Sequence, residues 1–412
     1  MEKSSSTAFL PLTGLIAAQV FALSVWFSSS AILPELAVEQ GLLLSSLSHL
    51  ATATQAGFVL GALVLAFTGL PDRLDPRRLF ASSAFLAAFA NLGLLVFPAD
   101  GVWATLSRLL VGAALAGVYP VGLKMAMSFA PHRRGLLASL LVGALVFGSA
   151  MPHLVALFRF QDWSLLLVVT TGLAAAGAII GLLMPEMRLV RAARFSASAL
   201  RLTFTDRELR RAYLGYFGHM WELYAFWAWV PLILTGSGLA QAVASGEESS
   251  FAALLTFVAM GLGGLACFPF GLLADRLGKD RVARWMLMGS GASALLCALA
   301  ISAAGEQGWT IWLQGVTILL ILGWGLFVIP DSPLFSAMVA EAAPAEVSGS
   351  LLTLQTAIGF GITIVSVQIV PVLAEQQGWP VVIVVLALGP VAGLLGLGKP
   401  APKNSGVRDH SA

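Results

Sequence analysis

Apolar runs of about 20 residues recur along this chain, and each is long enough to cross roughly 30 Å of hydrocarbon as a helix. Only 11% of the 412 residues are charged, against roughly 25% in a soluble domain. The runs are apolar on all faces, which excludes a membrane barrel and favours helices, whose backbone groups satisfy one another in lipid. We predict an all-α membrane protein with about twelve spanning helices. The runs lie at 9–34, 46–70, 79–98, 102–124, 135–158, 163–184, 211–234, 250–273, 282–303, 309–332, 347–373 and 379–397.

The charges between the runs predict an orientation. All but three of the 23 Lys and Arg residues fall at the termini or in alternate turns, beginning with Arg73, Arg77 and Arg78 after the second run. Because Lys and Arg mark cytoplasmic loops, we expect a multi-pass protein of the cell (inner) membrane with both termini in the cytoplasm. The first run is too long for a cleavable signal peptide and no small-residue cleavage site ends it, so we expect it to be the first span.

An internal repeat divides the chain. The turn Asp72-Arg73-Leu74 follows the second run, and Asp275-Arg276-Leu277 follows the eighth, six helices later. The only long polar segment between runs separates these halves. We therefore predict an N-terminal six-helix bundle at 1–186, a cytoplasmic linker at 187–210 and a C-terminal six-helix bundle at 211–412. Two repeated six-helix halves are the layout of a large class of secondary transporters.

On these residues the chain resembles the major facilitator superfamily over essentially its whole length. The turn at 271–281, GLLADRLGKDR, is similar to that family's G-x-L-A-D-R-x-G-[RK]-[RK] motif, whereas the turn at 68–78 has Thr68 and Asp75 where glycines are usual. The resemblance implies two pseudo-symmetric bundles that alternate access, with both turns acting as a latch on the cytoplasmic side. The expected latch residues are Asp72, Arg73, Asp275, Arg276 and Lys279. For Arg77 and Arg78, a role in topology alone is an equal alternative.

Arg108 lies within the fourth run and, with Gly112, matches the family's R-x-x-x-G pattern. In proton-coupled members this arginine is linked to proton transfer or substrate binding. Tyr119 returns to the same face at helical spacing, so the two side chains could receive an anionic headgroup. An equal alternative is that Arg108 stabilises the bundle through backbone carbonyls. The fifth run lacks the Gly-Pro of drug antiporters, which weighs against drug export.

Glu222 lies deep in the seventh run, about 11 residues of 1.5 Å rise from its cytoplasmic end. An ionised carboxylate there costs at least a few kcal/mol without a partner. His219 precedes it by one turn, and Phe226 and Trp229 continue the stripe, so we expect this face to look into the bundle. We predict that Glu222 carries a coupling proton that His219 orients or relays. The alternatives are a neutral pair that ties helices together and a Glu222–Arg108 bridge.

Other side chains are weaker candidates for a substrate cavity. Trp324 precedes Asp331, an acid between two prolines, where a broken helix could bind cations or bend as a gate, although a helix end is the favoured interpretation. For several of the others, packing within the bundle is an equal explanation. The full set of cavity candidates is Arg108, Tyr119, Gln19, Trp26, Phe226, Trp229, His153 and Trp324.

We therefore expect a secondary transporter that moves a small organic solute, an organic anion being favoured over a drug-like cargo, with coupling to protons. The alternative within the same fold is a proton-driven drug or metabolite exporter. A membrane enzyme or a non-transporting sensor carries less weight, because the five histidines are scattered and form no metal set. We expect no cofactor, no metal and no nucleic-acid partner, and a monomer in the lipid bilayer.

Overall fold

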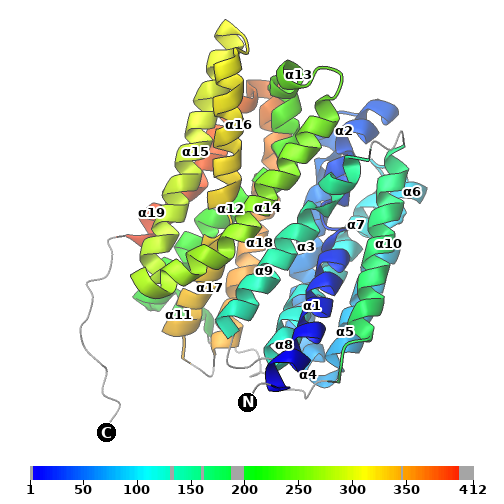
Figure 1. Cartoon of the computed structure of the whole chain (residues 1–412), viewed down its shortest axis with the longest axis vertical. Coiled ribbons are helices and arrows are strands. Elements are labelled where there is room, and N and C mark those ends of the chain that lie inside the picture. The colour runs from blue at the N-terminus through cyan, green and yellow to red at the C-terminus, as the bar shows by residue number, and fades with distance from the viewer. Residues whose placement is uncertain (1–2, 130–133, 159–161, 187–198, 345–346, 399–412) are drawn as a thin grey trace.

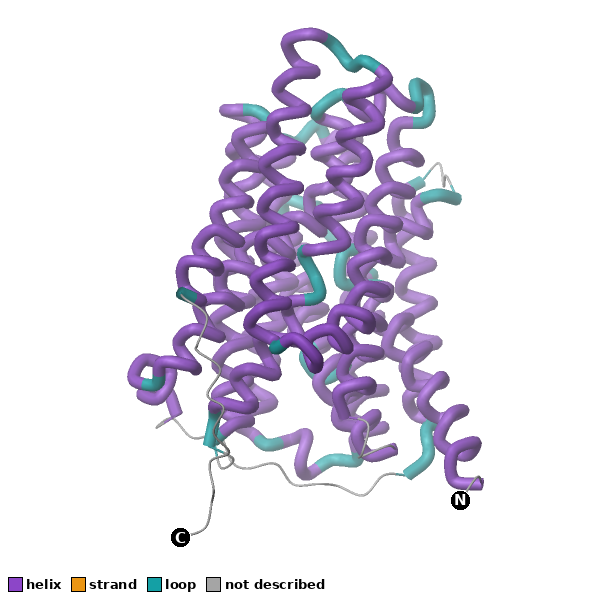
Figure 2. The backbone as a smooth tube through the Cα atoms, turned by 60° about the vertical axis from the view of Figure 1, so that its left-hand side comes forward, coloured by secondary structure: helices purple, strands orange, loops and turns teal. Residues whose placement is uncertain are grey.

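In the computed structural model, residues 3–129, 134–158, 162–186, 199–344 and 347–398 are described, and within these ranges all regular structure is helical (Figures 1 and 2). The first half of the chain holds α1 Lys3–Leu23, α2 Ser28–Gln40, α3 Leu44–Thr68, α4 Leu70–Arg73, α5 Pro76–Asn91, α6 Gly93–Val96, α7 Val102–Leu115, α8 Tyr119–Phe129, α9 Arg134–Ala156 and α10 Trp163–Leu182. The second half holds α11 Ala199–Thr205, α12 Arg207–Gly236, α13 Leu239–Val243, α14 Glu248–Leu277, α15 Lys279–Gln307, α16 Ile311–Phe327, α17 Asp331–Ala342, α18 Ser348–Gln377 and α19 Trp379–Leu397.

Eleven stretches of the described residues are helical, long and apolar enough to cross a membrane. The remaining long helix, α12, has 30 residues and reaches about 45 Å at 1.5 Å per residue, but His219 and Glu222 make it less apolar. With α12 the structure agrees with the expected twelve spans. The expected linker is only partly described: 187–198 lie outside the described residues, whereas 199–205 form α11.

Four of the expected spans are broken rather than continuous. The first is interrupted at residues 24–27 between α1 and α2, the third at Leu92 between α5 and α6, the fourth at 116–118 between α7 and α8, and the tenth at 328–330 between α16 and α17. The tenth also extends further than expected, because α17 continues to Ala342. Breaks inside spans are tolerated where the freed backbone groups find partners within the protein.

Close helix contacts depend on glycine in both halves. A Cβ on Gly112 of α7 would lie 1.9 Å from the carbonyl oxygen of Thr54 on α3, and a Cβ on Gly218 of α12 would lie 2.4 Å from that of Gly389 on α19. Small residues let spanning helices approach this closely. The helix pairs α3–α7 and α12–α19 are therefore closely packed, one pair in each half.

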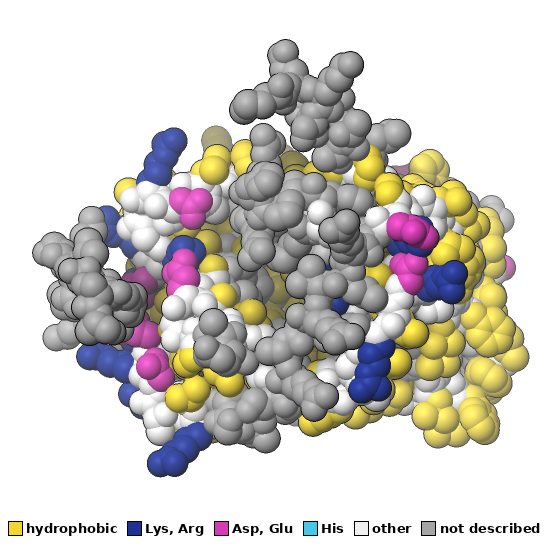
Figure 3. All heavy atoms as spheres, turned by 90° about the horizontal axis from the view of Figure 1, so that it is seen from below, with side chains coloured by type: hydrophobic (Ala, Val, Ile, Leu, Met, Phe, Trp, Pro, Cys, Tyr) yellow, Lys and Arg dark blue, Asp and Glu magenta, His cyan; other side chains and the backbone are white. Residues whose placement is uncertain are grey.

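The two halves contact each other through α3 against α18 and α9 against α14. Where α3 ends and α5 begins, Lys and Arg side chains gather on the surface, and we call this the basic end (bottom of Figure 1, face view in Figure 3). Its described members include Arg73, Arg77, Arg78, Arg201, Arg207, Arg210, Arg276, Lys279, Arg281 and Arg284, together with the buried Arg211. The opposite end carries acids that include Glu39, Glu247, Glu306 and Glu375.

Candidate functional site

A cavity of about 620 Å³ lies between the two halves. One wall comes from Trp26 and from α3, α8 and α9, and the facing wall comes from α12, α17 and α18. The cavity reaches the basic end, where Gly69, Pro71 and Lys124 line it from one half and Ser350 lines it from the other. Both halves therefore contribute to one central chamber, which is the place where an alternating-access protein holds its cargo.

The opposite end of this interface is closed by hydrogen bonds between the halves. Thr52 Oγ1 of α3 donates to Gln368 Oε1 of α18 at 3.1 Å, and Gln368 Nε2 donates to Ser48 Oγ at 2.6 Å. Further out, the backbone N–H of Ser45 donates to Glu375 Oε1 at 3.1 Å. With the cavity reaching the basic end, these contacts define a conformation that is closed at the opposite end.

An aromatic cluster, formed by Trp26, Phe58, Tyr224 and Phe360, lies at the inner part of the cavity. Ring centroids are 4.9 Å apart for Trp26 and Phe58, 4.5 Å for Phe58 and Phe360, and 4.8 Å for Tyr224 and Phe360. Trp26 also lies 5.9 Å from Tyr224. These rings come from both halves, so the cluster joins the two bundles across the cavity.

A buried acidic cluster of His219, Glu222 and Asp331 lies behind the α12 and α17 wall of this cavity. Each residue is 1% exposed. His219 Nδ1 lies 2.8 Å from Asp331 Oδ1, while Trp324 Nε1 donates to Glu222 Oε1 at 2.8 Å. Asp331 is close enough to Glu222 for their charges to interact. Among the described residues, no Lys or Arg lies within ion-pair distance of either acid.

Asp331 is the member of this cluster that the sequence did not place beside His219 and Glu222. The end of the tenth run was expected near residue 332, which would place Asp331 at a helix terminus. In the structure α16 and α17 together span Ile311–Ala342, so Asp331 lies well inside the bundle. The signal available in the sequence was an acid between Pro330 and Pro333, since such an interruption allows a polar side chain to turn inward.

The expected proximity of His219 and Glu222 on one face of α12 is present, but their partners differ from the expectation. His219 contacts Asp331 rather than Glu222. Glu222 is bound by Trp324, and no ion pair joins it to Arg108 in the described part of the chain. The face that carries both residues looks into the C-terminal half rather than into the central cavity.

Arg108 is fully buried in the N-terminal half and stabilises the break between α1 and α2. Its Nη2 donates to the carbonyls of Val25 at 3.0 Å and Trp26 at 3.1 Å, and its Nη1 donates to Asn91 Oδ1 at 2.7 Å and Ser28 Oγ at 3.3 Å. This arrangement is the carbonyl-bound alternative. Tyr119 lines the cavity but Arg108 does not, so the two do not form a joint headgroup site in this conformation.

Of the remaining cavity candidates, only Trp26 lies on the cavity wall. Gln19 donates to the carbonyl of Leu141 at 2.9 Å and Trp229 to that of Val367 at 2.9 Å, so both join neighbouring helices. Phe226 packs 4.5 Å from Trp324. His153 is buried in α9, and its Nε2 has no hydrogen-bond partner among the described residues. These side chains contribute to bundle packing in this conformation.

The latch turns lie at the basic end and are not joined across the halves in the described part of the chain. Arg73, Asp275 and Arg276 are exposed, and Lys279 forms an ion pair at 2.6 Å with Glu341 of its own half. Asp72 lies in α4, and its side chain is outside the described set. Nearby, Arg77 binds the Asp75 carboxylate at 2.6 Å, which holds the pKa of Asp75 below its usual value.

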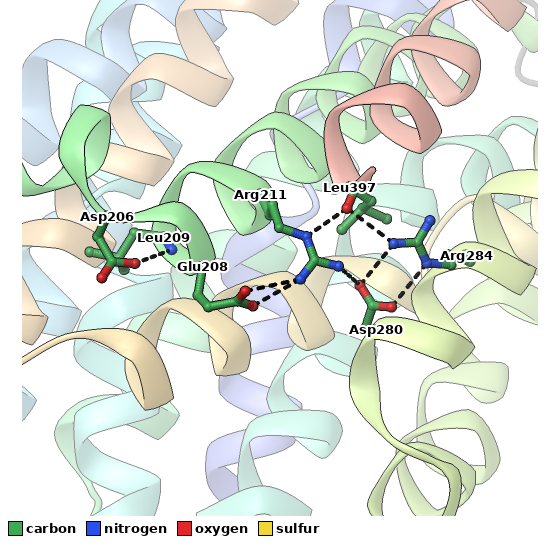
Figure 4. Close-up of polar contacts among 7 residues, drawn as sticks. All are labelled: Asp206, Glu208, Leu209, Arg211, Asp280, Arg284 and Leu397. Carbon is green, nitrogen blue, oxygen red and sulfur yellow. Dashed lines mark hydrogen bonds and ion pairs between the residues drawn. The ribbon is translucent and has the colours of Figure 1, made fainter. Parts of the chain in front are cut away.

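A polar network at the basic end fastens the last helix of the C-terminal half (Figure 4). Arg211 Nε donates to the carbonyl of Leu397 at 2.6 Å, and its Nη2 lies 2.9 Å from Asp280. Arg284 pairs with the same Asp280 at 2.9 Å and also donates to Leu397 at 3.1 Å. Glu208 completes the network through Arg211. The C-terminal carbonyls of a helix favour such cations.

No group of three or more His, Cys, Asp or Glu side chains in the described ranges is arranged to hold a metal ion. Cys267 and Cys297 are free and buried. Within the described residues, the titratable groups at depth include the acidic cluster, Arg108 and His153.

Comparisons with known proteins agree with this architecture. The chain is similar to the crystal structure of a D-xylose-proton symporter, with a TM-score of 0.70, 15% identity, and coverage of 94% of this chain and 95% of that chain. It is also similar to the crystal structure of a mutant of the nucleoside transporter NupG, with a TM-score of 0.71, 13% identity, and coverage of 94% of this chain and 98% of that chain. No curated protein matches it. The family model of the Major Facilitator Superfamily matches residues 15–367. The chain belongs to the Major Facilitator Superfamily and is a multi-pass membrane transporter rather than an enzyme.

Proposed function

We propose that this chain is a proton-coupled secondary transporter of a small organic anion, in which the bundles at 1–186 and 211–412 alternate access to the central cavity. The gathering of Lys and Arg at one end supports its placement in the cytoplasmic membrane with both termini in the cytoplasm. On that orientation, the structure is a cytoplasm-facing conformation. A single chain builds the whole cavity, which supports the monomer as the transporting unit.

The charge of the acidic cluster supports a proton site. With both carboxylates ionised and His219 protonated, Glu222, His219 and Asp331 carry a net charge of −1. Each residue is 1% exposed, and an uncompensated charge is expensive at that depth. One further proton makes the cluster neutral: Glu222 is then protonated and Asp331 is paired with the imidazolium. The cluster therefore favours exchange of one proton between a neutral and an anionic state.

The observation that carries the proposal is that the helices bearing the acids also line the cavity. On α12, His219 and Glu222 face the interior of the C-terminal half, while Tyr216 and Tyr224 face the cavity. On α17, Asp331 is followed directly by Ser332 on the cavity wall. A change in protonation alters the attraction between α12 and α17, and it thereby moves two elements that contact the cargo.

The charge of the cavity wall supports an anion as cargo. Lys124 lines the cavity near the basic end, donates to the carbonyl of Pro71 at 2.7 Å, and is the only charged side chain among the described lining residues. Tyr119 adds a hydroxyl to the same wall. Arg108, which is held by carbonyls, keeps the α1–α2 break in place and thereby positions Trp26.

The latch residues also support alternating access. In this conformation the charged turns after α3 and α14 are exposed, and Lys279 pairs within its own half. We infer that Asp72, Arg73, Asp275, Arg276 and Lys279 engage helix ends of the other bundle when the basic end closes. Carboxylates favour helix N-termini and cations favour helix C-termini, which provides such contacts.

A vesicle experiment tests the coupling. The full chain is reconstituted into liposomes that contain a pH-sensitive dye, and a panel of alkyl and aryl sulfonates is added outside. Sulfonates are strong acids and do not cross lipid as neutral molecules, so any acidification that they cause inside requires the protein. We expect acidification with wild type and with the Glu306→Gln control, an exposed site, but not with Glu222→Gln. Solute uptake without acidification, or equal acidification by Glu222→Gln, would contradict proton coupling at this residue.

A further inference from the structure

We propose that the central cavity is selective for aromatic organic anions, that is, solutes that combine a planar ring with one carboxylate or sulfonate group. This inference rests on the proposed function, because it names the substrate class of the same cavity. Two separate properties of the cavity wall support it. Aromatic rings line the wall, and some of its hydrogen-bond donors have no acceptor among the described residues.

The ring-binding surface is the aromatic cluster. Trp26 and Phe58 belong to one half, and Tyr224 and Phe360 belong to the other, with ring centroids 4.5–5.9 Å apart. Offset and tilted ring pairs at such distances are favourable. When the halves rock, rings that belong to different halves separate and lose these contacts. A planar ring inserted between them replaces the lost contacts, whereas a flexible or strongly hydrated solute does not.

The polar groups of the cavity wall favour a ligand that carries a hydrogen-bond acceptor. The Nε1 donor of Trp227 is buried without an acceptor in the described part of the chain, and Trp227 lines the cavity. Buried donors in native structures are almost always paired, so an unpaired indole N–H on a cavity wall points to a ligand acceptor. None of the hydrogen bonds found among the described residues involves the hydroxyl of Tyr119 or Tyr224, and both side chains line the same cavity.

Tyr119 and Tyr224 lie close enough to interact electrostatically, although they come from opposite walls. Together with Trp227 they place several donors around one region of the cavity. Lys124 adds a positive charge nearer the basic end, and no carboxylate is found among the described lining residues. Lys and Trp side chains donate but do not accept, so this wall satisfies a carboxylate or sulfonate better than an ammonium group.

Aromatic faces also attract cations, so an aromatic ammonium ion is the main competitor. Three probes separate the possibilities: 3-phenylpropanesulfonate has both ring and anion, 3-phenylpropylammonium has the ring with a cation, and propanesulfonate has the anion without a ring. Their binding to the full chain in detergent is measured by isothermal titration calorimetry. No membrane and no gradient are involved, so the result does not depend on proton coupling.

We expect 3-phenylpropanesulfonate to bind at least about tenfold more tightly than either of the other probes. Tyr224→Phe keeps the ring and removes the hydroxyl, and Lys124→Gln keeps a donor and removes the charge. Each should weaken binding about tenfold, as expected when a hydrogen bond or charge contact to an anion is lost. Tyr213→Phe is the matched control on α12, because that hydroxyl donates to the carbonyl of Leu351 outside the cavity.

Equal or tighter binding of the ammonium probe, equal binding of propanesulfonate, no binding of any probe, or unchanged affinity in both cavity variants would overturn the proposal. The vesicle experiment then separates this inference from the proposed function. If the aryl sulfonate binds in detergent but does not acidify vesicles, the substrate class stands and the coupling fails. If ringless sulfonates acidify vesicles as fast as aryl sulfonates, the coupling stands and the aromatic preference fails.

Discussion

Gln368 is the centre of the contacts that close the end opposite the basic end, and its replacement should shift the conformational equilibrium. The side chain is half-buried on α18, accepts a hydrogen bond from Thr52 at 3.1 Å and donates one to Ser48 at 2.6 Å. Both partners belong to the other half, so these bonds exist only while this end is closed. Gln368→Leu removes both and keeps a side chain of similar size.

The magnitude follows from the number of bonds lost. A typical intramolecular hydrogen bond contributes about 1 kcal/mol net, so two contribute about 2 kcal/mol. Because RT is about 0.6 kcal/mol, the ratio of closed to open molecules at this end should fall about 30-fold. The contact between Ser45 and Glu375 remains, so the variant should still sample the closed state.

Spin labels report this shift directly. Leu43 and Gln377 lie at the same end on different halves and are exposed, so cysteines introduced there can be labelled and their separation measured by double electron–electron resonance. We expect a second, longer distance to appear or grow in Gln368→Leu. The control is Gln307→Leu, an exposed change at the end of α15. A distance distribution in Gln368→Leu identical to that of wild type and the control would refute the assignment of these bonds as a closure.

Three further predictions concern folding and stability. Arg211→Ala should destabilise the C-terminal half by about 1–2 kcal/mol, because it removes one of the two arginines that bind Asp280 and the Leu397 carbonyl, and Arg284 keeps its contacts with both. Thermal melting in detergent should show this loss, with the exposed Arg207→Ala near wild type. Gly112→Val should give no monodisperse folded protein in size-exclusion chromatography, because even a Cβ at this position would lie 1.9 Å from the Thr54 carbonyl oxygen. The control Gly172→Ala has open space around it and should behave as wild type. The pKa of Asp75 is lowered by its hydrogen bond to Arg77, so its stabilisation should be present above the ordinary Asp pKa and disappear as the pH falls through the lowered value. Asp75→Asn should therefore flatten the fall in melting temperature below about pH 4, and a fall as steep as that of the Asp100→Asn control would contradict this.

The coarse architecture was accessible from the sequence because the membrane imposes it. Run length specifies spanning helices, and the repeated turns after α3 and α14 indicate two related halves. The break in the first span was not accessible, since residues 24–27 contain neither Gly nor Pro. That break depends on Arg108, which is distant in sequence and donates to the carbonyls of Val25 and Trp26. Hydropathy reports length and polarity but not which backbone groups find partners elsewhere.

The candidate site was only half accessible for a related reason. Helical spacing places His219 and Glu222 on one face of α12, and the structure has them there. Spacing cannot say which other helix that face meets, so the contacts with Asp331 and Trp324 were missed. Likewise, Trp229 was a candidate for the cavity wall, yet it joins α12 to α18, whereas Trp227 lines the cavity. Two residues on adjacent faces of a buried helix have different surroundings.

The central claim is that Glu222 takes up and releases a proton inside the bundle. Infrared difference spectroscopy on the purified full chain across a pH titration tests it most directly, because a protonated carboxyl group buried in protein gives a separate C=O stretching band. We predict a titrating band that is present in wild type and in Glu306→Gln and is lost in Glu222→Gln. An identical titrating band in Glu222→Gln, or no titrating carboxyl band in wild type, would contradict the account.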